Sequence, residues 1–184
     1  MRRCAAVGLC ALFAVALVAT ARADDKKSPQ DPTKRLDVLV GEWDVAVRYK
    51  LPDGKEYEGK ATCVTRRVLN DRFIQQEFTS RLNDQPLLVW QILGFDTIKK
   101  QFVETQLHAH GDDTHTMHSE GTFADNGNVL TLRGDSLDGF TGKPVKLRTV
   151  TTIKDRDHYT IEWFITDDSG KEERKVVLTH TRKK

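Results

Sequence analysis

Residues 101–127 read QFVETQLHAHGDDTHTMHSEGTFADNG, and this stretch contains two strand-like runs that each end in a turn signal. Apolar and polar side chains alternate in the first run, QFVETQLHAH, up to Gly111, and the second run, HTMHSEGTFA, ends at Asp125-Asn126-Gly127. Alternation with a period of two is typical of β-strands, and clusters of Gly, Asp and Asn are typical of turns. The stretch therefore predicts two antiparallel strands joined by a short hairpin.

The same pattern repeats on both sides of this stretch, from Trp43 to the C-terminus. Runs rich in β-branched and aromatic residues alternate with turns such as Pro52-Asp53-Gly54, and no long segment has a helical period. About ten short strands joined by short links favour an antiparallel meander, because Greek-key connections need long returns. We therefore predict an all-β fold, an antiparallel up-and-down barrel of about ten strands.

A short N-terminal helix is expected in front of the first strand. Asp31-Pro32 precedes the segment TKRLDVLV, which places a capping residue and a first-turn proline at the right positions. Such a helix would turn Leu36, Leu39 and Val40 inward, where they can close one end of the barrel.

The first and last strands of a closed meander lie side by side. One face of the first strand carries Trp43, Val45 and Val47, and one face of the last carries His180 and Arg182 with the apolar side chains before them. An arginine over the face of a tryptophan near the barrel end would combine packing with cation–π attraction, worth roughly 0.5–2 kcal/mol.

Residues 1–23 have the three parts of a secretory signal peptide. They begin with two arginines, continue with an uncharged apolar run, and end in the small-x-small sequence ARA at 21–23. The apolar run is shorter than the about 20 residues of a membrane-spanning helix. We expect cleavage to leave a chain that begins near Asp24, is periplasmic or extracellular, and has no stable membrane insertion.

Beyond the signal peptide, residues 24–35 are polar, charged and proline-bearing and predict a flexible tether, which leaves residues 36–184 for one barrel domain. The chain has 29 Lys and Arg and 27 Asp and Glu, and three of the arginines belong to the signal peptide. The mature chain is therefore close to neutral, and nothing in its charge favours a nucleic-acid partner. Cys63 is the one cysteine beyond residue 23; we interpret it as a small buried side chain.

Six segments occur in a characteristic order: LVGEWDV, LNDRFIQQEF, ILGFDTIKKQFVETQ, EGTFADNGNVLTLRGD, TGKPVKLRTVTTI and EERKVVLTHTRK. Together they resemble the bacterial domain-of-unknown-function 1579 family (DUF1579) over nearly all of residues 36–184. Gly41-Glu42-Trp43 and Arg182 also resemble the Gly-x-Trp and closing-arginine pattern of lipocalin-like barrels. The resemblance implies an exported lipocalin-like barrel, and it provides no agreed catalytic residues to transfer.

A barrel of this size holds either its own side chains or one small ligand. Polar side chains lie among aromatic and aliphatic ones on several strands, which is typical of a site for a small, amphipathic or hydrophobic molecule. The residues that we assign to ligand binding are Trp43, Glu77, Trp90, Glu104, Gln106, Trp163 and Arg182. The alternative is that the polar faces are solvated and the barrel is filled, which would make the chain a structural or interaction module.

Four of the 6 histidines lie in LHAHGDDTHTMH, residues 107–118. If residues 112–113 are the two central turn residues, His110 faces His115 across the hairpin and His108 lies on the same face. Three such imidazoles could ligate Zn²⁺ and leave a position for water or substrate, as in a metal-dependent enzyme or a metal carrier. A loop longer by one residue would pair His108 with His118 instead.

Against a metal site, hairpin tips are usually exposed to solvent, and imidazoles beside aspartates need no metal to explain them. Haem is a further alternative, since one histidine and a hydrophobic lumen suffice to ligate it. The sequence has no GxSxG, P-loop, GxGxxG or HExxH motif. We therefore predict a ligand-binding barrel rather than an enzyme, with no required cofactor; the sequence does not specify the ligand or the oligomeric state.

Overall fold

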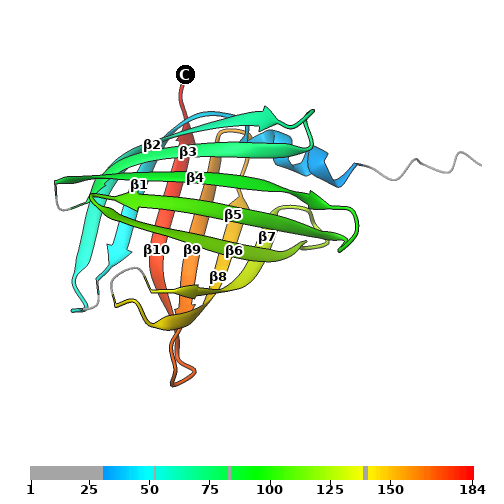
Figure 1. The fold of residues 1–184 in the computed structure, drawn as a ribbon. Helices are drawn as coiled ribbons and strands as arrows, with labels where there is room; N and C mark the ends of the chain where they lie inside the picture. Colours follow the sequence, from blue (N-terminus) through cyan, green and yellow to red (C-terminus); the bar gives the residue numbers. More distant parts are fainter. Residues whose placement is uncertain (1–30, 52, 83, 139–140) are drawn as a thin grey trace, which may run out of the picture. The chain divides into compact units, whose positions relative to one another are not determined.

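The computed structural model describes residues 31–51, 53–82, 84–138 and 141–184. These residues form one short 3-10 helix, η1, and ten strands (Figure 1). In chain order the elements are η1 (Pro32–Leu39), β1 (Gly41–Lys50), β2 (Glu56–Val68), β3 (Phe73–Leu82), β4 (Gln85–Asp96), β5 (Gln101–His110), β6 (Asp113–Phe123), β7 (Val129–Leu137), β8 (Pro144–Ile153), β9 (His158–Thr166) and β10 (Glu172–Arg182). The expected signal peptide, residues 1–23, lies outside the described residues, as do residues 24–30 of the expected tether.

The ten strands form a closed barrel in which every strand pairs antiparallel with its neighbours in the sequence. The last strand, β10, completes the circle by pairing with β1. The predicted fold class, an antiparallel up-and-down barrel, is therefore confirmed. Because side chains alternate across a strand, each strand places every second residue inside the barrel.

The pairing of β1 with β10 brings Trp43 opposite Arg182. The Arg182 guanidinium carbon lies 4.1 Å from the centre of the Trp43 ring, so the predicted stacking is confirmed. The same guanidinium donates hydrogen bonds to the carbonyl oxygens of Val38 and Val40, at 2.9 and 2.8 Å. Arg182 thus joins the last strand to the segment that precedes the first.

Helix η1 begins as the sequence predicts, because the Asp31 carboxylate accepts a hydrogen bond from the Thr33 amide at 3.0 Å and Pro32 occupies the first turn. Asp31 therefore caps this helix and residues 32–35 begin it, although the sequence predicted that they belong to the flexible tether. Leu36 and Leu39 are buried in the core. The Leu39 carbonyl accepts a hydrogen bond from the indole N–H of Trp43 at 3.0 Å.

Two arginines fix η1 across one end of the barrel. Arg67, near the end of β2, donates to the Thr33 carbonyl at 2.6 Å and from its Nε to the Asp37 carboxylate at 3.1 Å. Arg35 lies over the ring of Phe123, at the end of β6, with its guanidinium carbon 5.6 Å from the ring centre. Since β2 and β6 are far apart in the strand order, the helix spans this end and closes it.

The hairpin between β5 and β6 differs by one residue from the expected register. β5 ends at His110 and β6 begins at Asp113, so the two turn residues are 111–112. Gly111 adopts the positive φ, +56°, that such a turn needs. His110 therefore pairs with Asp113, and His108 pairs with His115. Neither of the two pairings considered from the sequence occurs. Among the described residues, no helix is both long and apolar enough to cross a membrane.

Candidate ligand-binding cavity

The interior of the barrel contains a cavity of about 460 Å³. Its lining includes residues from the ends of β1, β3 and β5, such as Lys50, Leu82 and His110, and from the connections that follow β7 and β9, such as Asp138 and Lys171. The η1 residues Leu36 and Leu39 are not part of the lining. The cavity therefore extends from the middle of the barrel toward the end opposite the helix.

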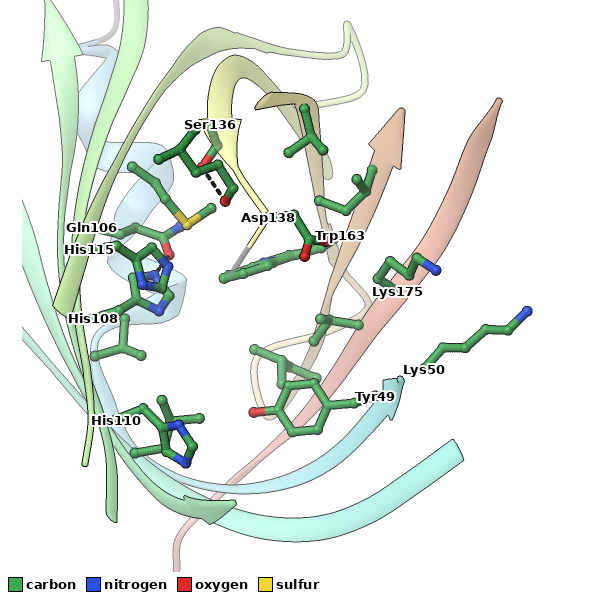
Figure 2. A pocket seen from close by; sticks show the side chains of 18 of the residues that line it. Tyr49, Lys50, Gln106, His108, His110, His115, Ser136, Asp138, Trp163 and Lys175 are labelled. Atoms are coloured by element: carbon green, nitrogen blue, oxygen red, sulfur yellow. Dashed lines mark hydrogen bonds between the residues drawn. The ribbon is translucent and has the colours of Figure 1, made fainter. Parts of the chain in front are cut away.

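Most of the cavity wall is apolar. Alternation places one aliphatic or aromatic side chain after another on the inner face, and the wall includes Phe78, Val89, Met117, Ile161, Trp163, Ile165, Val176 and Leu178. Trp163, from β9, projects into the cavity across from β5 and β6 (Figure 2). Burying apolar ligand surface against such a wall yields roughly 25 cal/mol per Å², so the wall supplies the driving force for binding.

A chain of hydrogen bonds links a buried carboxylate to this wall. The Glu104 carboxylate accepts hydrogen bonds from the amide nitrogens of Gln91 and Gln106, at 2.6 and 2.5 Å, and from the Ser119 hydroxyl at 3.1 Å. The amide oxygen of Gln106 lies 2.9 Å from Nε2 of His108. Burial raises the pKa of Glu104, and the three donors oppose that shift.

His108 and His115 form a pair on the cavity wall, one from each strand of the β5–β6 hairpin (Figure 2). Their rings stack, with centres 4.4 Å apart and planes inclined by 20°, and the edge of Trp163 contacts His108 at 5.8 Å between centres. Burial lowers the pKa of His108 to about 4, with a smaller effect from His115. Burial also lowers the pKa of His115. Both imidazoles are therefore neutral at pH 7.

A second polar cluster lies deeper, where Cys63, Gln76 and His180 line the cavity. The Gln76 amide donates to the Tyr159 hydroxyl at 3.4 Å, and the Tyr159 ring stacks on His180 with centres 4.0 Å apart. The His180 side chain is 1% exposed, and its Nδ1 has no hydrogen-bond partner among the described residues. Burial lowers the pKa of His180 to about 3 and raises that of Cys63 to about 11, so the imidazole and the thiol are both uncharged.

Charged side chains gather at the mouth. Glu173 forms ion pairs with both Lys50 and Lys175, and the hydrogen bonds from these two amines lower the pKa of the Glu173 carboxyl to about 2. Figure 2 shows Lys50 and Lys175 on the side of the cavity away from the histidine pair. The mouth is therefore charged, whereas the histidine wall and the deep cluster are neutral.

The structure places the predicted ligand-binding residues in four different locations, of which the first three lie inside the barrel. Gln106 and Trp163 line the cavity, as do all three histidines of the predicted metal site. Glu104 is buried directly behind Gln106 and does not line the cavity. Trp43 and Arg182 lie at the barrel closure near η1, outside the cavity lining.

Glu77 and Trp90 lie on the outside of the barrel, so their assignment to the cavity is wrong. They pair with each other across β3 and β4; Trp90 is 56% exposed, and the Glu77 carboxylate lies 3.6 Å from the Arg66 guanidinium. The inner face of β3 is instead formed by the residues of opposite parity, which include Gln76 and Phe78. The sequence FIQQEF carries a glutamine at both parities, which is why alternation alone did not identify Gln76.

Nothing in the described part of the chain forms a group of three or more His, Cys, Asp or Glu side chains able to hold a metal ion. His108 and His115 lie together, but Nε2 of His110 is directed to the Leu82 carbonyl at 3.1 Å. His118 lies on the outer face, 3.0 Å from the Thr105 hydroxyl. For haem, four histidines line the cavity, and no geometry distinguishes one of them as an axial ligand: His108, His110, His115 and His180.

Comparison with known proteins supports the fold and gives the family. The crystal structure of Rv2717c from M. tuberculosis is similar, with a TM-score of 0.61 at 18% sequence identity, and the match covers 83% of this chain and 98% of that one. At that identity the likeness concerns the fold. A search of curated proteins gives no match. The family model described as "Protein of unknown function (DUF1579)" matches residues 28–182, and the chain therefore belongs to the DUF1579 family.

Proposed function

We propose that this chain binds one small apolar or amphipathic molecule in the barrel cavity and performs no chemistry on it. The observation that carries the proposal is the cavity itself, because about 460 Å³ lies within the range of roughly 300–1,000 Å³ that small-molecule sites occupy. A barrel filled by its own side chains, the structural alternative, would not leave such a volume. The apolar wall supplies affinity, and the few polar groups orient the ligand.

The same proposal includes export. Residues 1–23 combine a positive start, an apolar run and a small-x-small sequence, which is the pattern of a cleaved signal peptide. A carrier outside the cytoplasm would hold a poorly soluble molecule in the lumen and present a charged exterior to water.

The test is a titration with N-phenylnaphthylamine, a neutral apolar dye whose fluorescence rises in an apolar environment. We expect saturable binding of one dye per chain. Met117 is buried on the inner face of β6 and lines the cavity, so Met117→Trp should fill the site and abolish binding. Thr116 is exposed on the outer face of the same strand, so Thr116→Trp should leave binding unchanged.

Two outcomes would refute the proposal. In the first, the wild-type protein does not bind the dye in a saturable manner. In the second, Met117→Trp binds the dye as well as Thr116→Trp does, which would place the dye on the surface rather than in the cavity.

A further inference from the structure

The hydrogen-bond chain behind the cavity wall determines which nitrogen of His108 carries its proton. The Glu104 carboxylate accepts from Gln106 and Ser119 on one oxygen, so the Gln106 side chain must present its NH₂ group to Glu104. The Gln106 amide oxygen is then the atom that faces Nε2 of His108, at 2.9 Å. A carbonyl oxygen only accepts, and therefore Nε2 of the neutral imidazole carries the hydrogen.

Since Nε2 is the donor, Nδ1 of His108 bears a lone pair and is an acceptor. No hydrogen bond to this Nδ1 is found among the described residues. The atom is nevertheless not fully buried. The acceptor is thus reachable from the cavity that His108 lines. A ligand that offers a donor at this point gains a hydrogen bond, and a ligand that offers only acceptors does not.

The charge distribution disfavours an anionic head group at the same place. The cationic side chains of the cavity lining are Lys50, Lys143, Lys171 and Lys175, and all of them lie near strand ends or in connections at the mouth. The side chains that contact His108, which are those of Gln106, His115 and Trp163, carry no positive charge. A carboxylate taken to this wall would lose its hydration without gaining a counter-charge, which is costly.

We propose that the ligand is an uncharged molecule whose hydroxyl or N–H group donates a hydrogen bond to Nδ1 of His108, with its apolar remainder against Trp163 and the aliphatic wall. This inference rests on the proposed function and specifies its ligand class: alcohols, phenols and similar neutral donors rather than fatty acids or other carboxylates. The polar group of the ligand is then held inside the barrel, and the charged mouth is not its anchor.

The experiment compares three probes with ten carbon atoms by calorimetric titration near pH 7.5, where decanoate is ionised and free imidazole is largely neutral. Decanol carries a donor, decanone is neutral without a donor, and decanoate is an anion. We expect the wild-type protein to bind decanol about fivefold more tightly than decanone, the ratio given by one neutral hydrogen bond. The affinity for decanol should exceed the affinity for decanoate by about tenfold or more.

His108→Phe keeps a ring in the stack with His115 and removes the acceptor. It should reduce the affinity for decanol about fivefold, to the level of decanone, while the affinity for decanone is unchanged. His118→Phe is the matched control, because His118 lies on the outer face of the same hairpin. It should preserve the difference between decanol and decanone.

If His108→Phe does not fold, the nitrogen chemical shift of His108 Nδ1 in the wild-type protein provides the same test: it should change with decanol and not with decanone. Decanoate binding as tightly as decanol, or a decanol preference that survives His108→Phe, would overturn the inference. In either case saturable binding of N-phenylnaphthylamine that is lost in Met117→Trp would leave the proposed function intact. Absence of binding by the dye and by all three probes would instead refute the proposed function.

Discussion

At the scale of single residues, Trp43 makes three contacts that hold the closed end of the barrel together. The Arg182 guanidinium carbon lies 4.1 Å from the centre of its ring, and its N–H donates to the Leu39 carbonyl. Its ring also packs edge to face with Tyr159, with the ring centres 4.7 Å apart. The residue is fully buried. Trp43 therefore connects the first strand, the last strand and the helix, and its replacement removes all three contacts at once.

The contact between Trp43 and Arg182 can be measured with a double-mutant cycle. Trp43→Ala should lower the free energy of unfolding by about 3–5 kcal/mol. Arg182→Ala should lower it by about 1–2 kcal/mol, because the cation–π contact and the hydrogen bonds to three backbone carbonyls are lost. The double variant should be less destabilised than the sum, since both single changes remove the same contact.

Urea unfolding of the four proteins provides these values. Arg174→Ala is a suitable control, because Arg174 is exposed and forms one ion pair among the described residues, with Glu162, an interaction worth about 1 kcal/mol or less. Strict additivity of the Trp43 and Arg182 changes would show that their contact contributes nothing to stability.

The histidines of the β5–β6 hairpin permit a second test at this scale. His108 and His115 stack, whereas His110 is directed to the Leu82 carbonyl, so three imidazoles do not converge on one point. We expect calorimetric titration with Zn²⁺ to show no tight stoichiometric binding, because two nitrogens supply half of the usual four ligands. One tight zinc ion per chain, lost when His108 and His115 are both replaced, would contradict this expectation and favour the metal-site alternative.

At the scale of the elements, the strand order and the closure were predictable because turn signals and alternation are local properties of the sequence. Which face of an individual strand points into the barrel was harder to predict. In β4 the run LLVWQIL is apolar at both parities, and the structure exposes Leu88 and Trp90 while Val89 and Gln91 face inward. Where both faces of a strand are apolar, the sequence does not show which side is the interior.

The register of the β5–β6 hairpin differs from the expected one for another physical reason. Two aspartates follow Gly111, and both residue types are common in turns. The glycine decides the register, because it adopts the positive φ without steric cost. A shift of one residue replaced the expected pairing of His110 with His115 by that of His108 with His115. Glu104, Gln106 and His108 occupy alternate positions of β5, so alternation places them on one face, but the hydrogen bonds that link them have no signature in the sequence.

The contact between β6 and β7 depends on Gly134. A Cβ atom at this position would lie 1.9 Å from the His118 carbonyl oxygen, so Gly134→Ala must separate the two strands. We expect it to lower the free energy of unfolding by about 1–3 kcal/mol, as overpacking does. Gly59→Ala is the control: the atoms nearest to its Cβ would belong to the Tyr57 side chain, the first at 2.8 Å, and that ring can move. Equal urea midpoints for the two variants would contradict the expectation.

At the scale of the whole molecule, the two most buried histidines make stability depend on pH. Their pKa values are about 4 for His108 and about 3 for His180, below the ordinary value of 6.5. As the pH falls below 6.5, the unfolded chain binds protons at these positions before the folded chain does. The free energy of unfolding should therefore decrease between about pH 6.5 and pH 4.5, above the range in which most carboxylates titrate.

The raised pKa of Glu104 has the opposite effect, because the folded state then takes up that proton more readily than the unfolded state. His180→Phe separates the contributions, since it removes one histidine and keeps a ring against Tyr159. Its free energy of unfolding should fall less steeply with decreasing pH than that of the wild-type protein. An identical slope, measured by urea unfolding at a series of pH values, would contradict the assignment.

Export by a cleaved signal peptide would change the length of the chain in the cell. We expect the protein isolated from its own cells to begin near Asp24, because residues 1–23 have the pattern of a signal peptide. Mass analysis of the intact chain provides the measurement. A mass that includes Met1 and the apolar run would be incompatible with export by this route.

Native mass spectrometry of the protein, purified without a histidine tag from its own cells, shows whether the barrel carries a small molecule. We predict a species with the mass of the chain plus one small molecule, which is retained in Thr116→Trp and lost in Met117→Trp. A bare chain mass in the wild-type protein, or an adduct that persists in Met117→Trp, would show that no small molecule occupies the barrel cavity.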